Sequence, residues 1–227
     1  MLQEDKEIKK SDKDILNRKN FANYLAINIQ NYLNKKDVNN CLTIGLIGEW
    51  GSGKTSLLNM TEEFLKEDKQ IKIIKFNPWI YSSYNQLVEQ FFDELIIEFT
   101  DSRDNTLRSY LRQYKLKVNE LNLAKNLAIA GVSLLDSRLG VAAEKIVKNS
   151  SEEKNLNYIK KKVSEQFYGR KVVCIIDDLD RLSKKEIMEM FKLIKIMADF
   201  KNIIYLVAFD QNVIAKALKE NYGEKYI

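Results

Sequence analysis

Apolar residues along the chain form two kinds of pattern, short continuous runs and longer segments with a helical period. Nearly continuous runs of this length are typical of buried strands, and they cover residues 42–47, 71–76, 172–176 and 203–209. Helical spacing predicts helices over residues 14–34, 54–67 and 85–100, after Ser183, and from Asp210 to about Tyr222. Because strands alternate with helices and are apolar almost throughout, the pattern predicts an α/β fold with a parallel sheet covered on both faces.

The stretch 101–168 separates the second predicted strand from the third, and it is charged and helical in pattern. We therefore interpret it as a helical insertion. It contains a nine-residue uncharged run, Leu127 to Leu135, which is less than half of the roughly 20 apolar residues that a membrane span needs. That run predicts a core or partner-facing helix and no membrane span. Residues 1–14 are highly charged, and we expect them to fray.

A phosphate-loop motif follows the first predicted strand. Residues 48–55 match G-x-x-x-x-G-K-[ST], and the loop with its next residue reads Gly48, Glu49, Trp50, Gly51, Ser52, Gly53, Lys54, Thr55 and Ser56. Glycines let backbone N–H groups converge on phosphate oxygens, and the helix behind the loop presents its positive end to them. Lys54 is placed to reach the β- and γ-phosphates, and the Thr55 hydroxyl to bind Mg²⁺. The alternative is a plain glycine-rich turn.

Paired carboxylates end the third predicted strand. Asp177 follows the apolar run directly, and an acidic residue at that point can hold Mg²⁺ opposite the phosphate loop. Asp178 is then placed to orient or deprotonate an attacking water, so it is the candidate catalytic base. The alternative is a solvated acidic turn.

Other polar residues near strand ends allow two interpretations each. Arg181 either contacts a γ-phosphate, in its own subunit or across an interface, or pairs with Asp178 or Asp180. Asp210 is a good N-cap for the last helix and also stands where a γ-phosphate sensor would lie. Asn77 is a candidate to hydrogen-bond the active-site water; the alternative is that Asn77-Pro78-Trp79 only ends the strand, with the tryptophan packed against the sheet.

Composition removes several chemistries. The chain has 227 residues and no histidine, which excludes His-based triads, bases and metal sites. The formal net charge of +5 is mild, and a lysine-rich surface accounts for it without a nucleic-acid partner. The charged N-terminal residues lack an apolar signal core, so we expect a cytoplasmic protein.

These motifs together resemble the KAP family of P-loop NTPases. The matching blocks are Gly48 to Ser56 with its internal tryptophan, Phe76 to Trp79, Ile176 to Arg181, Val207 to Asp210, and Asp14 to Arg18 with Phe21-Ala22. The resemblance implies a three-layer ATPase of the additional-strand class with strand order 5-1-4-3-2. In this chain it implies order 1-4-3-2, because the family's fifth strand and helical lid would begin where residue 227 ends. We therefore expect residues 1–227 to form one P-loop NTPase domain that is incomplete at its C-terminus.

The resemblance implies ATP and Mg²⁺ as ligands and an ATP-hydrolysing regulatory switch or assembly ATPase, plausible in bacterial defence. A protein partner or self-association then follows as an expectation. Alternatives are a nucleotide-binding scaffold without turnover, a DNA-linked remodelling ATPase and a small-molecule kinase, the last disfavoured because no arginine-rich acceptor lid is apparent. The motifs by themselves leave the choice between ATP and GTP open.

Overall fold

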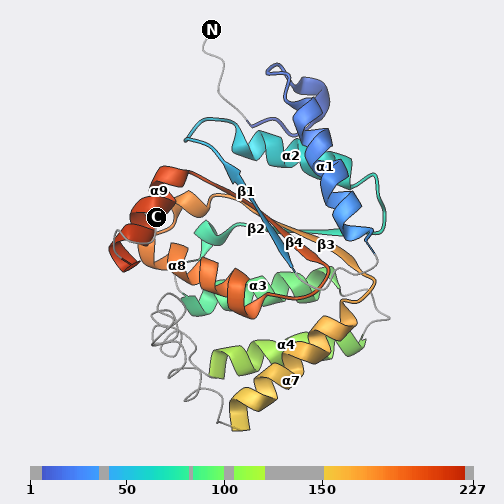
Figure 1. The fold of residues 1–227 in the computed structure, drawn as a ribbon, viewed down its shortest axis with the longest axis vertical. Coiled ribbons are helices and arrows are strands. Elements are labelled where there is room, and N and C mark those ends of the chain that lie inside the picture. Colours follow the sequence, from blue (N-terminus) through green and yellow to red (C-terminus); the bar gives the residue numbers. More distant parts are fainter. Residues whose placement is uncertain (1–6, 36–40, 82–83, 100–104, 121–150, 223–227) are drawn as a thin grey trace.

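The computed structural model describes residues 7–35, 41–81, 84–99, 105–120 and 151–222 (Figure 1). Four parallel strands form its sheet, in the order β1-β4-β3-β2. They are β1 (Leu42–Ile47), β2 (Ile71–Phe76), β3 (Lys171–Ile176) and β4 (Ile203–Phe209). The predicted fold class and the strand order 1-4-3-2 are therefore confirmed.

Helices cover both faces of the sheet, which gives three layers (Figure 1). One face is covered by α1 (Lys19–Leu33) and α2 (Lys54–Leu65). The other face is covered by α3 (Tyr84–Glu98), α8 (Lys184–Lys192) and α9 (Gln211–Tyr222). Short turns of 3-10 helix lie at Ser11–Lys13, Pro78–Ile80 and Leu179–Arg181, and a π-helix at Leu193–Met197 extends α8.

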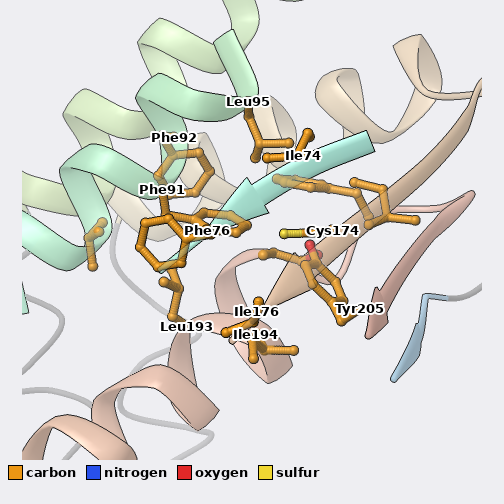
Figure 2. Close-up of a cluster of buried hydrophobic side chains, with 14 of the residues drawn as sticks. Ile74, Phe76, Phe91, Phe92, Leu95, Cys174, Ile176, Leu193, Ile194 and Tyr205 are labelled. Carbon is orange, nitrogen blue, oxygen red and sulfur yellow. The ribbon is translucent and has the colours of Figure 1, made fainter. Parts of the chain in front are cut away.

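The two central strands are buried on both sides because their alternate side chains enter different layers. In β4, Ile203, Tyr205 and Val207 face the α3 and α8 layer, whereas Ile204, Leu206 and Ala208 face α1 and α2. Figure 2 shows Tyr205 in the first layer with Cys174, Phe76 and Phe91. This double burial explains why the strands read as continuous apolar runs rather than as alternating ones.

Two described helices, α4 (Asn105–Glu120) and α7 (Ser151–Gln166), occupy the stretch predicted as a helical insertion. They pack on each other, and α4 packs on the outer side of α3 (Figure 1). Tyr114 of α4 meets Phe92 of α3 edge-on at 5.5 Å, so the core continues into this layer. The run Leu127 to Leu135 lies outside the described residues. Within the described ranges, no helix is both long and apolar enough to cross a membrane.

The first long helix begins later than predicted, at Lys19 rather than near Asp14. The Asp14 carboxylate accepts hydrogen bonds from the backbone N–H groups of Leu16 and Lys19, and Asn17 has a φ of 56°, so this segment is a turn. Ile15 and Leu16, which fitted the helical spacing, are 89% and 61% exposed. A local side-chain hydrogen bond competes successfully with helix here.

Residues 7–13 pack along α2, so the prediction that the whole N-terminal stretch frays was wrong for this part. The Ile8 N–H donates to Ser56 Oγ at 2.9 Å, and Asn59 Nδ2 donates to the Ile8 carbonyl at 3.1 Å. The Ser11 N–H donates to a Glu63 carboxylate oxygen at 2.7 Å. The high charge of this segment suggested that it does not pack on the domain, but polar side chains of α2 form hydrogen bonds with its backbone.

Glu62 is a buried carboxylate on α2 whose two oxygens pair with Lys66 at 2.7 Å and Lys75 at 2.8 Å. Burial by itself raises the pKa of the Glu62 carboxyl, but hydrogen bonds from Lys66 and Lys75 outweigh it and lower that pKa. We expect Glu62→Gln to reduce the free energy of unfolding at neutral pH by about 1 kcal/mol.

The sign of this effect follows from the lowered pKa. Stability from ionised Glu62 is fully present above its unfolded-state pKa and is lost as the pH falls through its lower folded-state pKa. Urea unfolding of wild type and Glu62→Gln should therefore differ at pH 7 and converge at low pH. Glu67→Gln, on an exposed residue, is the matched control. A Glu62→Gln effect that persists undiminished at low pH would contradict the ion-pair account.

Candidate functional site

The phosphate-loop motif joins the end of β1 to the start of α2. The Gly48 N–H donates to the Phe209 carbonyl at 3.2 Å, which continues the β1–β4 pairing into the loop. The Ser52 N–H donates to the Glu49 carbonyl at 3.1 Å and closes the turn. Gly53 is the N-cap of α2, with a φ of 84°, a left-handed conformation that glycine adopts without strain. The first free N–H groups of α2 follow directly behind the turn.

Arg18, in the turn before α1, forms a hydrogen bond with the backbone of the phosphate loop. Its Nη1 donates to the Ser52 carbonyl, which turns that oxygen toward the arginine. A Cβ on Gly53 would lie 2.8 Å from the same Nη1, so any larger residue there would displace the Arg18 guanidinium from this position. An arginine outside the motif therefore positions the motif's backbone.

Lys54 is the first residue of α2, and its ammonium folds back over the loop. Nζ donates to the carbonyls of Gly48 at 3.0 Å and Glu49 at 3.2 Å. It also lies 3.5 Å from Asp180 Oδ2, and both side chains are nearly buried. The lysine thus links the phosphate loop to the acidic end of β3.

The acidic pair after β3 adopts a strained turn. Asp178 has a φ of 57°, and its N–H donates to Asp177 Oδ1 at 2.9 Å. Its own carboxylate accepts from Asn77 Nδ2 at 3.1 Å and pairs with Arg181 Nε at 2.7 Å. A positive φ at a non-glycine residue is a feature found repeatedly at functional sites.

Burial raises the pKa of the Asp178 carboxyl, and the charge of neighbouring Asp177 raises it further. Arg181 and the Asn77 amide act against this rise without cancelling it. A carboxyl whose pKa lies above its usual value is a better proton acceptor at neutral pH. The environment of Asp178 therefore suits a general base.

A cavity of about 280 Å³ lies between the phosphate loop and the end of β3. Its lining contains most of the predicted site residues: Trp50, Gly51, Gly53, Lys54, Thr55, Ser56, Asp177 and Asp178. Gly48, Glu49 and Ser52 do not appear in that lining, and their carbonyls hold Lys54 and Arg18 instead. The fold thus brings the two predicted halves of the site, which are more than 120 residues apart in sequence, to one cavity.

Three lining residues were not assigned a definite role from sequence: Glu7, Asp180 and Arg181. Glu7 lies on the packed N-terminal segment and borders both this cavity and a neighbouring one of about 340 Å³. No local motif marks Glu7, because only the contacts with α2 bring it to the site. Asp180 stood within the acidic block, and its partner Lys54 becomes evident only in three dimensions.

Hydrogen bonds define contacts for two of the residues whose interpretation was open. Asp210 Oδ1 accepts from the Asn212 N–H at 2.8 Å, so Asp210 caps α9. Asn77 holds Asp178 with its amide nitrogen, and its Oδ1 accepts from the Trp79 N–H at 3.1 Å. Ser183 and Glu186 form a capping box at the start of α8.

The donors in the cavity fit magnesium. The Thr55 hydroxyl and the Asp177 carboxylate are hard oxygen ligands, and both line the same cavity as Lys54. Magnesium at such sites takes few protein ligands and completes its shell with phosphate oxygens and water. Thr55 and Asp177 are thus the residues suited to hold the ion.

A parallel sheet of order β1-β4-β3-β2, with a phosphate loop after β1 facing carboxylates after β3, defines a P-loop NTPase fold. Comparison with known families agrees: the KAP family P-loop domain matches residues 19–227. The chain belongs to the KAP family.

A curated relative is the phage T7 exclusion protein of Escherichia coli K12, to which this chain is 23% identical over 214 residues. The alignment covers 78% of this chain and 27% of the relative. The chain therefore spans only about a quarter of that relative's length.

Proposed function

We propose that this chain binds Mg-ATP in the cavity between the phosphate loop and the end of β3, and hydrolyses it. The observation that carries the proposal is the joint placement of Lys54, Thr55, Asp177 and Asp178 on one cavity. These are the groups that phosphoryl transfer to water requires: a cation for the phosphates, oxygen ligands for magnesium, and a base. Family membership supports nucleotide binding independently of this geometry.

Each residue then has a separate role. Loop and α2 backbone N–H groups bind the β-phosphate, and Lys54 moves its ammonium from the Gly48 and Glu49 carbonyls to the phosphates. Thr55 and Asp177 would hold Mg²⁺, and the ion would supply positive charge to the phosphates of the nucleotide. Asp178 orients a water in line with the γ-phosphate and accepts its proton, while Asn77 keeps the carboxylate in place.

In the cell we propose that nucleotide binding and hydrolysis drive a regulatory switch or an assembly step in defence against phage. The name of the phage T7 exclusion protein supports this proposal; the alignment with this chain covers 27% of that protein. The alternative is a DNA-linked role. In that case DNA should stimulate ATP hydrolysis, and the stimulation should fall steeply as the salt concentration rises.

Replacement of Lys54 tests the proposal. We expect Lys54→Ala to weaken ATP binding by about tenfold or more, because a charge-assisted contact to phosphate is lost. Titration calorimetry gives the affinity, and Mg-dependent phosphate release gives the activity. Lys69→Ala, on an exposed lysine in the turn before β2, is the matched control.

Two outcomes would change the proposal. Equal phosphate release from wild type and Lys54→Ala would contradict ATP hydrolysis at this site. Tight Mg-ATP binding by wild type with no phosphate release would instead identify a nucleotide-binding scaffold.

A further inference from the structure

Arg181 lies between the chain's two tryptophans. Its guanidinium carbon is 4.8 Å from the centroid of the Trp50 ring and 5.3 Å from that of the Trp79 ring. Trp50 belongs to the phosphate loop, Trp79 follows β2, and Arg181 follows β3, so the contact joins three strand-end segments. We name Trp50, Arg181 and Trp79 the tryptophan clamp.

The exposure of the two tryptophan rings is not explained by the ion pair between Arg181 and Asp178 alone. Trp50 is 70% exposed and Trp79 is 55% exposed, so both large rings remain largely in water while they contact Arg181. The turn at Asp178 does not require the arginine side chain, because the Arg181 backbone N–H donates to the Asp178 carbonyl at 3.1 Å. An arginine that only neutralised Asp178 would need no aromatic contact.

A guanidinium that is stacked between aromatic rings can still donate hydrogen bonds in its own plane. Its N–H donors lie in its plane, so aromatic rings against its flat faces do not block them. Nε is the atom that pairs with Asp178, which leaves the Nη edge for an acceptor in the cavity. Arg181 lines the same cavity as Lys54 and Thr55, and a planar fork of this kind matches phosphate oxygens in a bidentate way.

We propose that Arg181 recognises the terminal phosphate of the bound nucleoside triphosphate, and that Trp50 and Trp79 hold its guanidinium plane for that contact. The inference rests on the proposed function and adds the residue that distinguishes triphosphate from diphosphate. It also links recognition to chemistry. When the Nη edge donates to the phosphate, Nε can still pair with Asp178, so one guanidinium contacts both the terminal phosphate and the candidate base, which Asn77 also holds.

Nucleotide titrations of Arg181→Ala test the inference, with Mg-ADP and a non-hydrolysable Mg-ATP analogue as probes. Because both tryptophans of the chain belong to the clamp, intrinsic fluorescence reports on it directly. We expect Arg181→Ala to bind the analogue about tenfold to a hundredfold more weakly, the range for a hydrogen bond to a charged group. The affinity for Mg-ADP should change by less than about threefold, since ADP lacks the contacted phosphate.

Further variants separate charge from geometry. Arg181→Lys keeps the charge but lacks the planar fork, so it should also lose preference for the triphosphate analogue. Trp79→Ala keeps the arginine and should reduce that preference severalfold. Arg112→Ala, on an exposed arginine of α4, is the matched control and should behave as wild type. Thermal unfolding of each variant checks that the fold is retained.

The outcomes are distinguishable. If Arg181→Ala weakens Mg-ADP and the analogue equally, Arg181 has only a structural role and the inference is wrong, while the proposed function stands. If wild type binds neither nucleotide, the proposed function fails and the inference fails with it. Full triphosphate preference in Arg181→Lys would show that charge alone suffices and would contradict the role of the clamp.

Discussion

Replacing Asp178 with asparagine is expected to lower Mg-dependent ATP hydrolysis by about 100-fold to 10,000-fold, the usual contribution of a general base. Asparagine has nearly the same shape but cannot accept a proton from water at neutral pH. Mg-ATP binding should persist, because Lys54, Thr55 and Asp177 line the cavity independently of Asp178. Phosphate release measured beside calorimetric binding separates the two effects.

The pH profile gives a second test of the same residue. As the pH falls through the pKa of Asp178, the carboxyl takes up a proton and can no longer act as a base, so wild-type hydrolysis should decline. Burial raises that pKa, so the decline should begin at higher pH than for an ordinary aspartate. The residual activity of Asp178→Asn should lack this acidic limb. An unchanged limb in the variant would assign the titration to another group.

The loss of activity in Asp178→Asn is not expected to come from unfolding. A raised folded-state pKa means that ionised Asp178 is disfavoured in the folded protein, so a neutral side chain should not lower the melting temperature. Asp12→Asn makes the same chemical change at an exposed aspartate and serves as the control. Hydrolysis that falls equally in both variants would rule out a specific role for Asp178.

Phe91→Ala is expected to reduce the free energy of unfolding by about 3–5 kcal/mol, the range for a large side chain removed from a core. Phe91 of α3 is fully buried against the sheet (Figure 2). Its ring meets Phe76 edge-on at 5.4 Å, Phe92 at 5.5 Å, and lies 6.3 Å from the Tyr205 ring. Those neighbours belong to two strands and to α3 itself, so the cavity cannot collapse without moving the sheet.

Urea unfolding of wild type and variant measures this difference. Phe21→Ala is the matched control, because Phe21 on α1 is 54% exposed and its loss should cost less than about 1 kcal/mol. Similar losses in the two variants would show that the α3 layer contributes less to stability than its burial implies.

Much of the fold was predictable because its signals are local. The four strands were predicted within one residue of their observed ends, since continuous burial of β3 and β4 produces uninterrupted apolar runs. The phosphate loop was predictable because Gly53, Lys54 and Thr55 must be adjacent to form it. The proximity of Asp177 to the phosphate loop was predictable because ligands of parallel α/β sheets bind at the carboxyl ends of the strands, where both lie.

Other features depended on contacts between distant segments. Ile15 and Leu16 suggested a longer α1, yet the Asp14 carboxylate holds them in a turn. Glu7 reached the site only because residues 7–13 pack on α2. Such contacts leave no periodic pattern in the sequence, so pattern reasoning does not detect them.

The sequence by itself determined the layered α/β fold, the phosphate loop and the acidic strand end, because each depends on neighbouring residues and on burial. Only the tertiary structure decided the partners of Lys54, Asp178 and Arg181. Arg181 had two open roles in sequence, and its place between Trp50 and Trp79 depends on three segments that meet only when the sheet forms. The partners of side chains at the edge of a sheet depend on the order and register of its strands, and no short stretch of sequence determines either.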